Sequence, residues 1–93
     1  MHTAFKGIEY DSVKATANER KHGVSFADAE QALRDQFAAT MEDPDAEGEA
    51  RFVTLGMDSR QRVLVVIWTP RGDNARVLSA RKASRSEAKI YAQ

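Results

Sequence analysis

The segment RVLVVIWT, residues 62–69, constrains the fold of this chain more than any other stretch of its sequence. Apolar side chains fill both sets of alternating positions, so a strand formed here has two apolar faces. A strand of this kind is covered on both sides, as in the centre of a sheet. The neighbouring segments RFVTLGM and ARVLSAR alternate instead, and the turn-like links DSRQ and PRGDN are short enough for antiparallel hairpins between the three strands.

A first helix is predicted to begin after Asp11, which is a suitable N-cap residue. Val13 and Ala17, spaced i, i+4, give this helix a thin apolar stripe. Gly23 follows at the position where glycine enters the left-handed conformation without steric cost. The preceding Lys21 and His22 lie in the last turn, where the helix dipole favours cations, so a helix end explains the sequence RKHG.

Two further helices follow from capping signals. Ser25 and Asp28 begin a second helix that ends near Asp35, and Ser84 with Glu87 forms the S-x-x-E capping box of a C-terminal helix. The predicted buried face of the second helix consists of Phe26, Ala29, Ala32 and Leu33.

The remaining segments complete an α+β fold. FKGIEYD is predicted to be a short first strand or an extended lead-in, and FAATM is a candidate for a short second strand. The order β-α-α-β-β-β-β-α then places two N-terminal helices and a C-terminal helix on an antiparallel sheet.

The composition indicates one small globular domain that spans residues 1–93. Hydrophobic residues make up 42% and charged residues 30% of the chain, which distinguishes it from disordered sequences. The absence of cysteine excludes disulfides and thiolate metal sites. No segment has the apolar length of a signal peptide or a membrane-spanning helix, so we expect a cytoplasmic protein.

The two halves of the sequence carry opposite charge, although the whole chain is neutral. Residues 1–50 hold five Lys/Arg and eleven Asp/Glu, a net charge of −6, whereas residues 51–93 hold nine Lys/Arg and three Asp/Glu, a net charge of +6. A basic half can bind an anionic polymer, and an acidic half can bind a basic partner. Alternatively, the two sets of charges interleave in the folded domain and cancel.

The basic residues of the second half occur on predicted strands and on the last helix. Arginine suits phosphate because its planar group donates two hydrogen bonds and stays charged. The alternative is that these residues lie on solvated edges, where they deter edge-to-edge pairing of strands. The candidates for an anion-binding surface are Arg51, Arg62, Arg76, Arg81, Lys82, Arg85 and Lys89.

RNA cleavage without a metal requires a base for the 2′-hydroxyl proton, fixed cations at the phosphorus and an acid for the 5′-oxygen. Histidine titrates nearest to neutral pH, which makes His22 a candidate for proton transfer. Tyr91 would need neighbouring cations to lower its pKa, and packing of the last helix is its alternative role. Glu47 and Glu49 are further candidates in a predicted loop.

That loop, EDPDAEGEA, carries five acidic residues together with Pro44 and Gly48. A metal site is conceivable there, but the spacing of a calcium-binding loop is absent. A solvated acidic turn is the better interpretation, and we expect neither a metal nor a cofactor.

Three stretches together resemble the BrnT family of toxins from bacterial type II toxin–antitoxin modules: KHGVSFADA, EDPDAEGEARFVTLGM and VLVVIWTPRGDNARVLSARKASRSEAKIY. The match runs in order from about Tyr10 to Tyr91. The resemblance implies a RelE-like fold and a small ribonuclease that cleaves RNA and inhibits translation. It also implies neutralisation by a BrnA-type ribbon-helix-helix antitoxin in a hetero-oligomer, expected to be a heterotetramer, which contacts promoter DNA only through the antitoxin.

The resemblance also singles out individual residues. The recurrent polar positions of the family are matched here by Lys21, His22, Glu49, Arg51, Thr69, Arg76, Ser79, Arg81, Glu87 and Tyr91. The predicted catalytic residues are Arg51, Arg81, Arg76, His22, Lys21 and Tyr91. The predicted RNA-binding residues are Arg62, Lys82, Arg85 and Lys89. Two alternatives to a nuclease remain: a non-catalytic nucleic-acid-binding or regulatory module, and a structural partner whose acidic half docks a basic protein.

Overall fold

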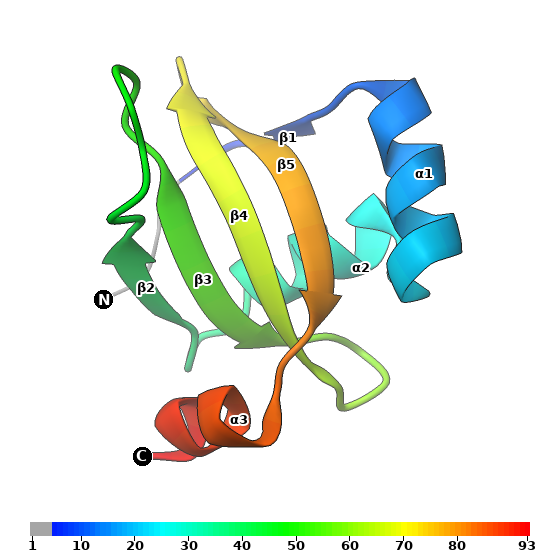
Figure 1. The fold of residues 1–93 in the computed structure, drawn as a ribbon, viewed down its shortest axis with the longest axis vertical. Helices are drawn as coiled ribbons and strands as arrows, with labels where there is room; N and C mark the ends of the chain where they lie inside the picture. The colour runs from blue at the N-terminus through cyan, green and yellow to red at the C-terminus, as the bar shows by residue number, and fades with distance from the viewer. Residues whose placement is uncertain (1–4) are drawn as a thin grey trace.

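The computed structural model describes residues 5–93, which form three helices and five strands (Figure 1). The strands make one sheet in the order β1-β5-β4-β3-β2. The elements, in chain order, are β1 (Ile8–Glu9), α1 (Ser12–His22), α2 (Phe26–Leu33), β2 (Ala39–Glu42), β3 (Phe52–Met57), β4 (Val63–Arg71), β5 (Asn74–Lys82) and α3 (Arg85–Ala92). The predicted α+β order is confirmed.

Strand β4 lies in the centre of the sheet, as its two apolar faces predict. Strands β2, β3, β4 and β5 pair antiparallel. The predicted antiparallel sheet departs from that pattern at one edge only, where β1 pairs parallel with β5. No hairpin joins these two strands, because nearly the whole domain separates them in sequence, so the turn geometry does not impose an antiparallel direction.

Helix α2 covers the back of the sheet and forms the core with it (Figure 1). Its predicted buried face is confirmed, since Phe26, Ala29, Ala32 and Leu33 are all buried. Gly56 of β3 faces this helix, and a Cβ atom added there would lie 2.1 Å from the carbonyl oxygen of Ala32. The helix therefore approaches the strand so closely that only glycine fits at this position.

The predicted apolar stripe of α1 does not face the core. Val13 is 76% exposed and Ala17 is exposed. Asn18 is buried instead, and its amide nitrogen donates to the carbonyl oxygens of Val24 and Ala80. Its amide oxygen accepts from the backbone of Ala80. A polar residue takes the inward position because β5 offers it backbone groups at that point.

The predicted caps of the helices are confirmed. Asp11 accepts hydrogen bonds from the first turn of α1, and Gly23 ends that helix with φ 69°. Both Ser25 and Ser84 form reciprocal capping boxes with the acid three residues later.

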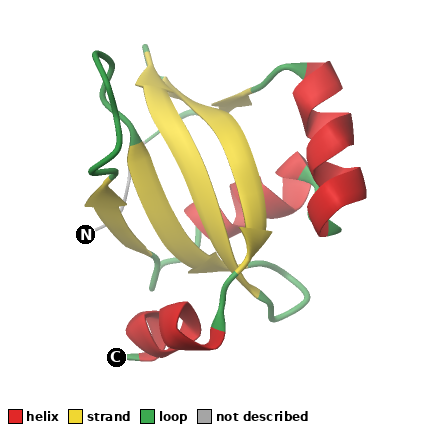
Figure 2. Cartoon of the chain, in the orientation of Figure 1, coloured by secondary structure: helices red, strands yellow, loops and turns green. Residues whose placement is uncertain are grey.

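Three predicted boundaries shift (Figure 2). Helix α2 ends at Leu33, because the Asp35 carboxylate accepts from the amides of Phe37 and Met57 and stabilises a turn. Strand β2 begins at Ala39 rather than at Phe37 for the same reason. Strand β4 extends into the predicted turn PRGDN as far as Arg71.

The side of the sheet opposite α2 is called the front face, and it faces the viewer in Figure 1. Helix α3 lies across the lower end of this face in that view and contacts β3. The strand registers place the following side chains on the front face: Met41, Val53, Leu55, Met57, Val65, Ile67, Thr69, Arg76, Ser79 and Arg81.

Candidate active site

Strand β5 carries a row of polar side chains on the front face. Val77 and Ala80 are buried in the core, so Arg76, Ser79 and Arg81 project from the other side. A bulge opposite Ile67 and Trp68 leaves Leu78 without a cross-strand partner within this row. Bulges redirect side chains and are frequent next to active sites.

Lys21 and His22 lie beside the middle of this row. Together with Leu78 and Ser79 they line a hollow of about 260 Å³ between the end of α1 and β5. Gly23 ends α1 at this point, and the negative end of the helix favours a cation there. The sequence RKHG therefore ends a helix and also borders the candidate site.

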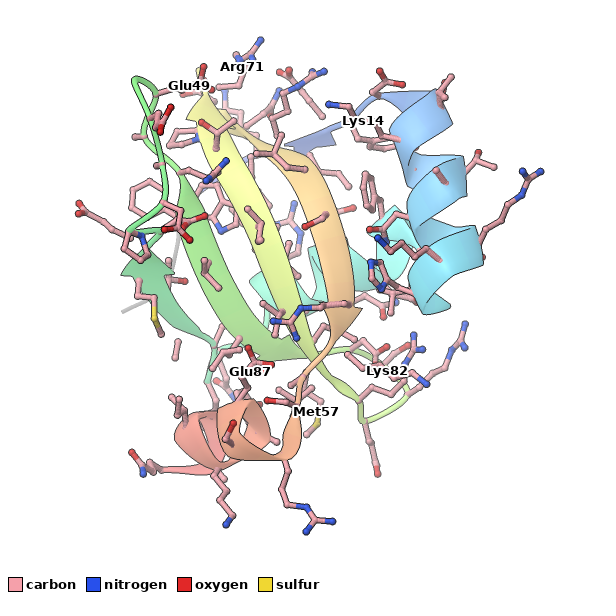
Figure 3. The ribbon with its side chains drawn as sticks, viewed as in Figure 1. Lys14, Glu49, Met57, Arg71, Lys82 and Glu87 are labelled. Atoms are coloured by element: carbon pink, nitrogen blue, oxygen red, sulfur yellow. The ribbon has the colours of Figure 1, made fainter. Side chains whose placement is uncertain are left out.

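A second hollow of about 150 Å³ lies on the other side of Leu78 and is lined by Glu49, Arg51 and Thr69. The buried Thr69 hydroxyl is 2.8 Å from Glu49 Oε1, to which it donates. Arg51 Nε donates to Asp43 at 2.8 Å. Figure 3 shows Glu49 at the upper end of β4. Because Leu78 lines both hollows, they are neighbours on one surface.

Arg76 lies directly opposite Thr69 in the register of β4 and β5. The structure thus gathers five predicted catalytic residues along the front of β5: Lys21, His22, Arg51, Arg76 and Arg81. Fixed cations, an imidazole and a carboxylate on one surface are the groups that phosphodiester cleavage requires.

Glu49 lies beside the predicted catalytic residues, although its position in a loop gave it only a secondary place among the candidates from the sequence. Its position depends on the hydrogen bond from Thr69, twenty residues further along the chain. The E-x-R spacing of Glu49 and Arg51 directly before β3 is the signal that could have identified it.

The Arg81 guanidinium forms a bidentate ion pair with Glu87 of α3, with both N–O distances at 2.8 Å. The hydrogen bonds from Arg81 lower the pKa of Glu87 from its usual 4.5 to about 2. The same contact raises the pKa of Arg81. Both groups are therefore charged at neutral pH, and α3 is joined to β5 through them.

Tyr91 lies apart from this group. Its hydroxyl donates to Asp35 at 2.5 Å, and no cation contributes to its environment among the described residues. Burial and the neighbouring carboxylate raise the pKa of Tyr91 to about 12. A catalytic role for Tyr91 requires neighbouring cations, but its neighbour is the Asp35 carboxylate. The alternative role of Tyr91, packing of the last helix, matches this position.

Arg62 is held away from the front face by acidic residues. It pairs with Asp58 at 2.8 Å and with Asp28 at 3.0 Å, and it donates to the carbonyl oxygen of Gly23. The side chain is only 19% exposed, which is typical of a structural ion pair. Within residues 5–93, the other predicted RNA-binding residues are exposed and form no ion pair: Lys82, Arg85 and Lys89.

The charges of the two halves interleave in part. Arg51 pairs with Asp43, Arg62 with Asp28, and Arg76 lies 3.9 Å from Glu9. The basic half therefore keeps its unpaired charge mainly at the end of β5 and on α3.

No group of three or more metal-ligating side chains occurs among residues 5–93. Nor does this part of the chain contain a helix of the length and apolarity needed to cross a membrane.

Comparisons with known proteins agree with this fold. Residues 10–87 match the family model described as the ribonuclease toxin BrnT of type II toxin–antitoxin systems. The crystal structure of the Brucella abortus ribonuclease toxin BrnT is similar to this fold, with a TM-score of 0.63 and 29% sequence identity. That match covers 85% of this chain and 97% of the Brucella chain. A search of curated protein sequences gave no match. The chain belongs to the BrnT family of ribonuclease toxins of type II toxin–antitoxin systems.

Proposed function

We propose that this toxin is a metal-independent endoribonuclease whose site is the front of β5. The observation that carries the proposal is the position of Leu78 between two hollows, one with Lys21 and His22 and the other with Glu49 and Arg51. A single phosphodiester placed over Leu78 would have cations on both sides. It would also have one proton-transfer group on each side, His22 on one and Glu49 on the other.

In the proposed reaction the RNA 2′-hydroxyl oxygen attacks the phosphorus, and the bond from phosphorus to the 5′-oxygen breaks. One of Glu49 and His22 takes the 2′-hydroxyl proton, and the other delivers a proton to the 5′-oxygen. Arg51, Arg76 and Arg81 stabilise the charge that develops on the phosphate oxygens. The products are a 2′,3′-cyclic phosphate and a free 5′-hydroxyl, and no metal takes part. Cleavage of messenger RNA by this route stops translation.

The experiment compares Arg51→Ala and Arg81→Ala with the control Arg20→Ala, which removes an exposed charge from α1. Each of the first two should lower RNA cleavage by about 100- to 1000-fold, because preorganised charge is a large catalytic contribution. The control should cleave normally, and chelator should not change any rate. Full activity in both site variants, or activity restored to a chelated sample by one metal, contradicts the proposal. Binding of RNA without cleavage by the parent protein would favour the non-catalytic module.

The partner is proposed to be a BrnA-type ribbon-helix-helix antitoxin that covers the front face and its basic rim. Inhibition then follows from blocked access of RNA, and promoter DNA is bound through the antitoxin alone. An antitoxin segment that folds on binding can wrap a surface of this size. The complex is expected to be a heterotetramer, which light scattering of the co-purified proteins tests.

A further inference from the structure

Helix α3 buries little of its own apolar surface, although Leu55 and Val65 on the front face are each only 3% exposed and Tyr91 is partly buried. None of its residues is buried, and its large apolar residue Ile90 is 47% exposed. Apolar burial is the main source of stability for a short helix in a protein. Polar contacts therefore contribute a large share of the attachment of α3 to the front face.

Two polar contacts do so, one near each end of the helix. The first is the bidentate pair of Glu87 with Arg81, and the second is the hydrogen bond of Tyr91 with Asp35. Figure 3 shows Glu87 beside α3 at the lower end of the sheet, near Met57. We name these contacts the Glu87 latch and the Tyr91 latch.

The Glu87 latch occupies one N–H group on each terminal nitrogen of Arg81, which is one of the two bidentate positions at which a guanidinium binds phosphate. Carboxylate and phosphate bind a guanidinium in the same bidentate manner, so they compete for it. Arg81 cannot bind a substrate phosphate through these two groups while Glu87 holds them.

We propose that α3 is a displaceable cover whose opening releases Arg81 for an RNA phosphate. This inference rests on the proposed function, because it concerns the same arginine. In the closed state Glu87 occupies the phosphate position, and in the open state the substrate takes its place.

The surrounding contacts allow α3 to open without loss of the neighbouring structure. Asp35 keeps its bonds from the amides of Phe37 and Met57 when Tyr91 leaves. The amide of Ala83 donates to Val63, so the chain stays fixed to the sheet just before the helix. The joint at which the helix turns is thus at Ser84.

The test uses Glu87→Gln and Tyr91→Phe in the full chain. Glutamine keeps the capping box with Ser84 but removes the charge from the Glu87 latch. Phenylalanine keeps the ring and removes the donor of the Tyr91 latch. The matched controls are Glu19→Gln and Tyr10→Phe, since neither side chain forms a hydrogen bond or an ion pair among the described residues.

The first measurement is amide hydrogen exchange over residues 85–92. Each latch variant should speed it by about five-fold relative to its control, as expected for the loss of one partly exposed polar contact. The second is a titration with inorganic phosphate, followed by the NMR signal of the Arg81 side chain. Glu87→Gln should lower the phosphate dissociation constant by about five-fold, because a larger fraction of Arg81 is free.

Unchanged amide hydrogen exchange over residues 85–92 in both latch variants would overturn the proposal that α3 is a displaceable cover. Equal or weaker phosphate binding by Glu87→Gln would show that Glu87 orients Arg81 for the anion, which also overturns it. Neither measurement depends on RNA cleavage. If exchange and phosphate binding change as expected while no variant cleaves RNA, the cover stands and the proposed function fails.

Discussion

A single buried amide joins the first helix to the sheet. Asn18 contacts Val24 and Ala80 through three hydrogen bonds, and all three residues are buried. Sequence patterns did not predict this, since an asparagine in a helix gives no sign of facing inward. Its partners lie six and 62 residues away, so only the folded structure reveals them.

Replacement of the Asn18 amide should lower the free energy of unfolding. Asn18→Leu should lower the free energy of unfolding by about 2 to 3 kcal/mol, because buried backbone groups lose their partners. Urea denaturation measures the change. The control Ala17→Leu adds an apolar side chain to the exposed neighbour and should shift stability by less than about 0.5 kcal/mol. A small effect of Asn18→Leu would mean that water replaces the amide.

At the scale of the elements, local sequence signals predicted where the helices begin. They predicted less well where each helix packs on the sheet. The capping residues Asp11, Ser25 and Ser84 lie next to the turns they stabilise, so a short window of sequence contains the whole signal. The attachment of α3 involves Tyr91 and Asp35, which are 56 residues apart. The candidate site behaves in the same way: its arginines were visible in the sequence, whereas its grouping around Leu78 depends on a bulge in the sheet.

The two latches should make α3 sensitive to extremes of pH in opposite directions. The pKa of Glu87 is about 2 in the folded protein against an ordinary 4.5. The contribution of the Glu87 latch to the stability of α3 is therefore complete above pH 4.5 and is lost as the pH falls through 2. Tyr91 has a folded pKa of about 12 against an ordinary 10, so its contribution is complete below 10 and is lost as pH rises through 12.

NMR signals of α3 followed across pH test both limits. They should stay constant between about pH 5 and 9 and change outside that range. Tyr91→Phe should remove the alkaline change, and Glu87→Gln should weaken the acid change, to which Asp35, whose pKa is lowered by its hydrogen bonds, also contributes. A transition of α3 near neutral pH in the parent protein is the contrary outcome.

In the folded molecule, ion pairs between the acidic and the basic half of the sequence neutralise part of the surface charge. The pairs of Arg51 with Asp43 and of Arg62 with Asp28 cancel charge between the halves. The exposed Lys82, Arg85 and Lys89 leave positive charge around α3. The acidic loop before β3 retains negative charge at Asp45 and Glu47, and both residues are exposed.

Association with the antitoxin should therefore slow as ionic strength rises, because screening shortens to about 8 Å at 0.15 M salt. Charge reversal at Arg85 should slow association more than charge reversal at Asp45. Stopped-flow rates for these two variants across a salt series decide the question. Equal rates without a salt trend would indicate an interface that is mainly apolar.

The close contact between Gly56 and the Ala32 carbonyl has a consequence for populations of cells that carry this toxin. Every change of the Gly56 codon to another amino acid adds a Cβ atom where none fits. Each such change therefore forces the backbone of α2 or β3 to shift. Growth arrest by an unneutralised toxin selects survivors with an inactive copy. Codon 56 offers many single-nucleotide routes to that state, so survivors should carry changes there repeatedly, although Gly56 is not among the candidate site residues.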